Sequence, residues 1–204
     1  MKKIFCSFLL CVFFYSSSAP AQQKGYATIR KVDFRNFTYG EVCTAGEKNI
    51  SVKNGIYFKD PPDDPEKIHF VDFEIIKIVY GDITRDGLED AVIVTFCNTG
   101  GTGQFTNGLL YTLDKGQPKF AGELGVGDRA NGGLYDVSFE NGILLVERFG
   151  QENSGACCAE YIWTEQLKWE KGKPASLTPI IKRPLTKEDI DYRHPHSNLT
   201  IPIP

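Results

Sequence analysis

Beyond its first 21 residues, the sequence has no apolar run long enough for a transmembrane helix, which needs about 20 such residues. It also lacks an excess of basic residues. Removal of residues 1–21 takes away two of the 23 Lys and Arg residues, which leaves 21 basic against 26 acidic residues and a net charge of −5. Nucleic acids and anionic membranes attract basic surfaces. The composition therefore argues against both as partners and against a transmembrane anchor.

Familiar catalytic motifs are absent as well. The chain has no Gly-x-Ser-x-Gly elbow, no His-Glu-x-x-His pair and no phosphate-binding Gly-Lys-Ser/Thr loop. It also has no Cys-x-x-Cys pair, which would favour zinc. No spacing places any of its three histidines beside a Cys or Ser partner. An enzyme is therefore the less favoured reading, and a secreted hydrolase that uses loop carboxylates stays open as the alternative.

The N-terminus has the pattern of a secretory signal peptide. Lys2 and Lys3 precede the apolar stretch "IFCSFLLCVFFY", and "APA" at residues 19–21 offers small residues for cleavage. We expect cleavage near Ala21 and export to the periplasm or the medium. The 183 residues that follow suit one domain with a real core. We expect a β-rich domain over 22–182 and a mobile, proline-rich tail over 183–204.

Four cysteines stay in the mature chain, and an even number in an exported protein suggests disulfides. Cys97 ends one predicted strand, and Cys157 and Cys158 begin another at the same end of the sheet. A bond between adjacent cysteines closes a strained eight-membered ring. We therefore predict that Cys97 bonds Cys157 or Cys158 and that Cys43 takes the other.

Short β-prone segments fill the chain, and no long helical period is present. "FVDFEIIKIVY" alternates apolar and polar residues, but the alternation shifts at Ile75–Ile76, which indicates a bulge. "AVIVTF" is apolar throughout and predicts a strand buried on both faces. Asn54–Gly55 and Asn141–Gly142 are typical of two-residue hairpin turns. We expect a mainly β, single-domain fold: an antiparallel meander or a small sandwich with a curved sheet.

The last predicted strand, "AEYIWTEQLKWE", places Tyr161, Trp163, Leu167 and Trp169 on one face. Glu165 is the only exception to this apolar alternation. Tryptophans at such spacing are more often part of a core than of a binding site.

The loop between two predicted strands, "GDITRDGLED", raises the possibility of a calcium site. Calcium prefers closely spaced oxygen ligands around a glycine-assisted turn. The candidate ligands are Asp82, Thr84, Asp86, the Leu88 carbonyl and Asp90. Thr84 stands where Asp or Asn is usual, and Arg85 adds a positive charge. The competing interpretation is an acidic turn in which carboxylates accept hydrogen bonds from backbone N–H groups.

This loop resembles the Asp-Gly segment of FG-GAP or VCBS proteins, found in integrin-α-type propeller blades. The resemblance covers residues 79–94 and implies calcium binding. A propeller needs at least four blades, so one copy does not imply that fold. The segments "NTGGTG", "GDRANGGL" and "GACC" extend a wider resemblance to uncharacterised exported bacterial proteins, which implies no activity.

Strand order also places the longer loops. Successive connections of a meander alternate between the two ends of the sheet, so loops 98–103, 125–133 and 150–156 should share the end opposite the Asp loop. Polar loops on a rigid sheet are common binding sites. The candidate ligand-binding residues are Asn98, Thr99, Thr102, Asp128, Arg129, Asn131, Glu152 and Asn153. We expect a non-catalytic domain that binds an envelope or extracellular ligand or protein there. A purely structural envelope protein is a further alternative.

Overall fold

The computed structural model describes residues 25–44, 48–153, 158–177, 179–186 and 189. The predicted signal peptide and cleavage site, Cys157 and residues 190–204 lie outside the described residues. The described chain forms a single, mainly β domain of antiparallel sheets, as the sequence predicted. A search of this described part finds no helix with the length and apolar character needed to span a membrane.

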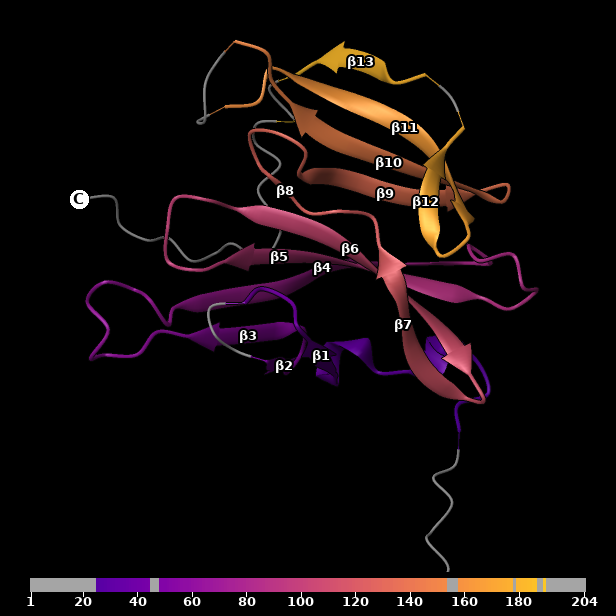
Figure 1. Ribbon diagram of the computed structural model, residues 1–204, viewed down its shortest axis with the longest axis horizontal. Helices are drawn as coiled ribbons and strands as arrows, with labels where there is room; N and C mark the ends of the chain where they lie inside the picture. The colour runs from indigo at the N-terminus through magenta and orange to yellow at the C-terminus, as the bar shows by residue number, and fades with distance from the viewer. Residues whose placement is uncertain (1–24, 45–47, 154–157, 178, 187–188, 190–204) are drawn as a thin grey trace, which may run out of the picture.

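The largest sheet is a curled meander of six strands. Its main path, β3-β4-β5-β6-β7, follows chain order, and β8 pairs with β6 next to the end of β7 (Figure 1). The strands are β3 (Ile56–Lys59), β4 (Val71–Gly81), β5 (Asp90–Asn98), β6 (Phe105–Asp114), β7 (Gln117–Glu123) and β8 (Gly127–Asp128).

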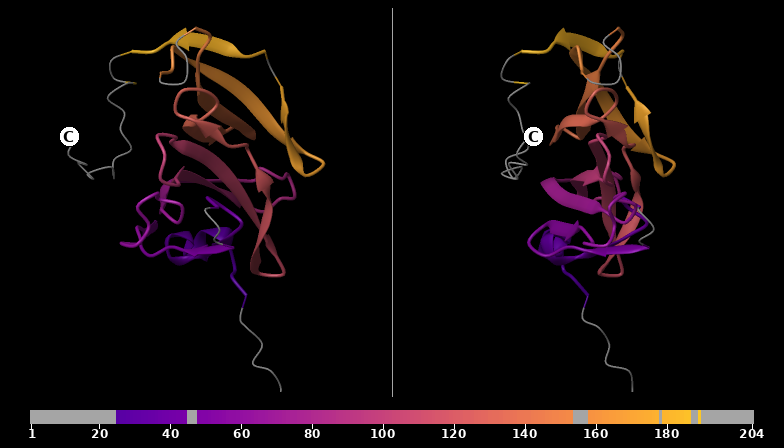
Figure 2. Two further views of the ribbon diagram at one scale, coloured as in Figure 1. Left: turned by 60° about the vertical axis from the view of Figure 1, so that its left-hand side comes forward. Right: turned by 90° about the vertical axis from the view of Figure 1, so that its left-hand side faces the viewer.

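A second meander, β9-β10-β11-β12, lies over one face of the first sheet (Figures 1 and 2). β12 and β13 pair with opposite halves of β11 and together form its outer edge. The strands are β9 (Leu134–Glu140), β10 (Ile143–Gly150), β11 (Tyr161–Glu170), β12 (Lys173–Ser176) and β13 (Ile181–Pro184).

An N-terminal layer covers the opposite face of the large sheet (Figure 2). It contains two short 3-10 helices and a two-stranded sheet: η1 (Ile29–Lys31), η2 (Phe34–Asn36), β1 (Thr38–Gly40) and β2 (Asn49–Ser51). Tyr39 is fully buried here, and its hydroxyl donates a hydrogen bond to the Phe34 carbonyl at 2.7 Å. The large sheet is therefore the middle of three layers.

β5 contributes to both hydrophobic cores. Ala91 and Ile93 pack toward the N-terminal layer, whereas Val92 and Val94 pack toward the second sheet. Successive side chains of a strand point to opposite faces, so a strand between two cores must be apolar at every position. The prediction that "AVIVTF" is buried on both sides is confirmed at these four residues.

The predicted turns and bulge are also present. Asn54 and Gly55 have φ of 52° and 86°, and Asn141 and Gly142 have φ of 52° and 76°. Positive φ at both positions is what a type I′ hairpin turn requires. The register between β4 and β5 shifts between Ile75 and Lys77, which confirms the bulge.

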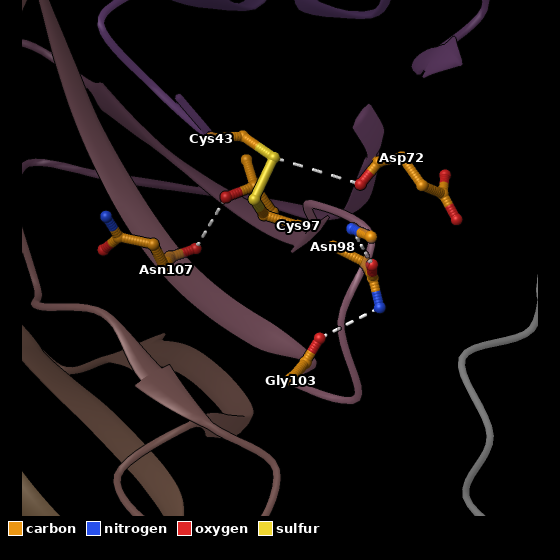
Figure 3. The surroundings of a disulfide bond; sticks show 8 residues. Cys43, Asp72, Cys97, Asn98, Gly103 and Asn107 are labelled. Atoms are coloured by element: carbon orange, nitrogen blue, oxygen red, sulfur yellow. Dashed lines mark hydrogen bonds between the residues drawn. A yellow bond between two sulfur atoms is a disulfide. The ribbon is translucent and has the colours of Figure 1, made fainter. Parts of the chain in front are cut away.

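The predicted disulfide pairing is wrong, because Cys43 bonds Cys97 (Figure 3). Cys97 lies an even number of residues after Ile93, so its side chain points toward the N-terminal layer that contains Cys43. Strand counting identified the end of the sheet at which Cys97 lies, but not the face toward which its side chain points. Cys158 is also disulfide-bonded, and Cys157 lies outside the described residues.

The expected tail begins within a strand. Arg183 belongs to β13 and pairs with Ile162 of β11. Its guanidinium forms two hydrogen bonds with Asp189, which is only 6% exposed. The described part of the predicted tail is therefore anchored to the second sheet.

Candidate functional site

The three longer loops meet at one end of the two sheets, at the left of Figure 1. The Arg129 N–H donates to the Gln104 carbonyl at 2.9 Å, which joins the second loop to the end of the first. The Gly132 N–H donates to the Phe149 carbonyl at 2.7 Å, and the Phe149 N–H donates to Gly133 at 2.9 Å. These bonds tie the second loop to the end of β10, where the third loop begins.

The Asp loop and the Asn141–Gly142 turn lie together at the other end. Arg85 Nη2 donates to the Gly142 carbonyl at 3.3 Å across this end. The alternation of connections in the two meanders therefore places the loops as the sequence analysis expected.

An open depression of about 600 Å³ lies between the three loops. Each loop contributes to its lining, which consists of Thr102, Gly103, Asp128, Arg129, Ala130, Asn131 and Gln151. Four of the eight predicted ligand-binding residues are among them. Sequence reasoning missed Gln151, whose only signal is its place directly after the end of β10.

Asn98 stabilises the first loop. Its amide nitrogen donates to the carbonyls of Gly101 and Gly103 at 3.1 and 2.9 Å, and its Oδ1 accepts the Gly100 N–H at 2.8 Å (Figure 3). A loop of three glycines would otherwise be conformationally free. Asn98 therefore stabilises the backbone of the first loop and is not part of the lining of the depression. Thr99 lines a separate cleft beside the disulfide.

Asp128 organises the second loop. Its two carboxylate oxygens accept hydrogen bonds from the N–H groups of Gln104 and Ala130, at 2.8 and 2.9 Å. Its backbone also exchanges two hydrogen bonds with Asn131. The carboxylate is thus committed to backbone donors on two loops, although the residue lines the depression.

Thr102, Arg129 and Asn131 differ from these residues. Their side chains are exposed and form no hydrogen bond or ion pair within the described part of the chain. The lining side chains without a described partner are therefore one guanidinium, one hydroxyl and one amide, on loops stabilised by Asn98 and Asp128.

Glu152 and Asn153 lie outside the lining of the depression. Glu152 Oε1 accepts an ion-pair hydrogen bond from Lys182 Nζ at 2.6 Å. The N–H groups of both residues donate to the Glu160 carboxylate at 3.0 Å. These contacts stabilise the third loop.

Arg148 supports the second loop and was missed by sequence reasoning. Its guanidinium donates to the carbonyls of Leu124 and Gly132 at 2.7 and 2.9 Å, and its Nε lies 3.1 Å from Glu165 Oε1. The sequence held a signal, because Arg148 follows Leu144 and Val146 on the inner face of β10. The anomalous Glu165 of β11 pairs with Val146 and is therefore a diagonal neighbour of Arg148.

The carboxylates of the Asp loop accept the backbone N–H hydrogen bonds that the acidic-turn interpretation predicts. Asp82 Oδ2 accepts the Gly87 N–H at 3.2 Å, and Asp86 Oδ1 accepts the Leu88 N–H at 2.8 Å. Asp90 Oδ2 accepts the Thr84 N–H at 2.7 Å. Gly87 has φ of 86°, which favours glycine. Among the described residues, no group of three or more His, Cys, Asp or Glu side chains is arranged to hold a metal ion.

Buried oxygens that lack hydrogen bonds nevertheless lie in this loop and at Thr112 of β6, whose side chain is near Asp90. Within the described ranges, the buried side-chain atoms without a hydrogen bond are Asp82 Oδ1, Thr84 Oγ1, Asp90 Oδ1 and Thr112 Oγ1. Burial raises the pKa of Asp90. The Thr84 amide and the nearby hydroxyls of Thr84 and Thr112 oppose this pKa shift, although neither hydroxyl is aligned to bond Oδ1. A buried polar atom without a partner costs about 1–3 kcal/mol.

Comparison with known proteins gives no family for this chain: no protein-family model, no curated protein and no solved structure matches it.

Proposed function

We propose that this chain is a non-catalytic exported β-domain that binds a ligand or protein partner through the three-loop end. The observation that carries the proposal is the set of uncommitted polar side chains, Thr102, Arg129 and Asn131, around one depression. Backbone hydrogen bonds join the second loop to the end of the first loop and to β10. A preordered site loses less conformational entropy on binding than a loose one.

Two observations support export. The Cys43–Cys97 disulfide is typical of oxidising compartments outside the cytoplasm. The N-terminal sequence also has the charged, apolar and small-residue regions of a signal peptide.

A hydrolase is the less favoured alternative because the loop carboxylates already have partners. Asp128 accepts two backbone N–H groups, and Glu152 pairs with Lys182. A general acid or base needs a carboxyl group that can exchange a proton with substrate. A screen of glycan and ester substrates tests this alternative. Turnover that is lost in Asp128→Asn or Glu152→Gln would overturn the binding proposal.

The binding proposal is tested by capture from the host's envelope fraction with immobilised protein. Asn131→Trp would fill the depression with a bulky side chain, whereas Glu140→Trp places the same side chain at the exposed opposite end. We expect the same ligand to be captured by the wild type and Glu140→Trp and lost by Asn131→Trp. Equal capture by all three proteins would show that the depression is not the binding surface.

We also infer a structural cation at the Asp loop as a second candidate role. The supporting observation is that four buried oxygens without hydrogen bonds occur in this loop and at Thr112 of β6, and that Thr84 and Thr112 lie near Asp90. Hard cations such as calcium take carboxylate and hydroxyl oxygens. The site lies at the end opposite the depression, so its ion would stabilise the fold rather than contact the ligand.

A further inference from the structure

The uncommitted polar groups around the depression are mainly hydrogen-bond donors. The Arg129 guanidinium offers up to five N–H groups, and Asn131 and Thr102 add an amide and a hydroxyl. The backbone N–H groups of Thr102 and Gly103 donate to no acceptor within the described part of the chain. The carbonyl of Gly103 already accepts from Asn98. The uncommitted side chains that line the depression therefore offer more hydrogen-bond donors than acceptors.

No neighbouring carboxylate of the described residues forms an ion pair with Arg129. The Asp128 carboxylate accepts two backbone N–H groups, and Glu152 is paired with Lys182. The charge of Arg148, which supports the second loop, is balanced by Glu165. Among the charged side chains that line the depression, Arg129 alone forms no hydrogen bond or ion pair with a described residue.

We propose that the depression binds an oxyanion group, a carboxylate or a phosphate, of a small ligand through Arg129. The planar guanidinium can donate two parallel hydrogen bonds to either group. Thr102 and Asn131 flank it and supply neutral donors to the remaining oxygens. This inference rests on the proposed function, because it names the chemistry of the ligand for the same site.

The test is a titration of isotope-labelled protein followed by amide resonances in NMR. The probes are inorganic phosphate, D-glucuronate and neutral D-glucose, each at constant ionic strength. We expect saturable shifts at Thr102, Gly103 and residues 129–131 with at least one of the two anions, with a dissociation constant of about 10 mM or tighter, and no shifts with glucose. Phosphate and glucuronate distinguish the two oxyanions, and a response to either supports the proposal.

Arg129→Gln removes the charge from an exposed side chain, so the fold should persist. It should weaken anion binding by about tenfold or more, as expected for the loss of charge-assisted hydrogen bonds. Arg85→Gln removes the same charge at the opposite end and should leave binding unchanged. The absence of saturable shifts with both anions, or equal binding by Arg129→Gln and the wild type, would overturn the inference. If capture of an envelope ligand still depends on Asn131 but not on Arg129, the proposed function survives and only the oxyanion assignment fails.

Discussion

Arg148 and Glu165 form an ion pair on the inner face of the second sheet, where their side chains are only 7% and 14% exposed. Arg148 Nε lies 3.1 Å from Glu165 Oε1, and its other nitrogens donate to the carbonyls of Leu124 and Gly132. One side chain thus links β11 to both ends of the loop that contains Arg129. The position of the proposed binding loop depends on this buried guanidinium.

Arg148→Met should lower the free energy of unfolding by about 3–5 kcal/mol, because it leaves the charge of Glu165 buried without its partner. The carbonyls of Leu124, Gly125 and Gly132 also lose their donor. Urea denaturation measures the loss, and faster amide hydrogen exchange in residues 125–133 would show that the loop opens.

Lys119→Met provides the matched control. Its ion pair with Asp114 is 64% and 53% exposed, so its loss should cost less than about 1 kcal/mol. The double variant Arg148→Met/Glu165→Met should recover part of the stability, since no unpaired charge stays buried. A cost for Arg148→Met no larger than that for Lys119→Met would contradict the role assigned to Arg148.

Reduction or removal of the Cys43–Cys97 bond should also destabilise the fold. The bond joins residues 54 positions apart, for which the chain-entropy relation gives about 4 kcal/mol. Cys43→Ser/Cys97→Ser should therefore lower the free energy of unfolding by up to that amount. Non-reducing peptide mapping should recover one peptide that joins Cys43 to Cys97. A peptide that joins Cys97 to Cys157 or Cys158 would refute the pairing.

Local features of the fold were predictable because their causes are local in sequence. The Asn-Gly turns follow from residues that tolerate positive φ, and the bulge at Ile75–Ile76 follows from a shift in alternation. The meeting of the three loops followed from strand alternation alone, once the strands had been identified.

Features that depend on contacts between layers were not predictable in the same way. The choice of Cys43 for Cys97 depends on which layer covers which face of β5, and strand counting carries no such information. In the sequence, Arg148 and Glu165 are visible as two charged residues at positions where the alternation predicts apolar ones. Recognising it as a pair requires the register of β10 against β11.

Asp189 should contribute stability that depends on pH. Its hydrogen bonds with Arg183 hold the pKa of its carboxyl well below the ordinary 3.8, against the opposing effect of burial. Because the folded pKa is depressed, this stability is present above pH 3.8 and is lost as the pH falls toward the folded pKa. Asp189→Asn should therefore lower the free energy of unfolding by about 2 kcal/mol near neutral pH.

Urea denaturation at several pH values checks this prediction. The difference between the wild type and Asp189→Asn should shrink below about pH 4. Asp114→Asn, at an exposed ion pair, should show neither the loss nor the pH dependence. A difference that stays constant through the acidic range would show that Asp189 acts through packing rather than through its charge.

The cation at the Asp loop is tested by comparing Asp90→Asn with Asp86→Asn. Asp90 is fully buried with one unpartnered oxygen, whereas Asp86 is exposed and accepts a local N–H group. If the buried oxygens bind calcium, millimolar calcium should raise the melting temperature of the wild type and of Asp86→Asn but not of Asp90→Asn. Differential scanning calorimetry measures both increments.

The same variants should give a different result if no cation binds to the loop. Burial raises the pKa of Asp90, so its ionised form is disfavoured in the folded state and costs stability at pH values above the folded pKa. Without a bound cation, Asp90→Asn removes that cost while its amide oxygen can still accept the Thr84 N–H. Asp90→Asn would then be as stable as the wild type or more stable near neutral pH, and calcium would shift the melting temperature of neither protein. That result would reject the cation and establish the loop as an acidic turn.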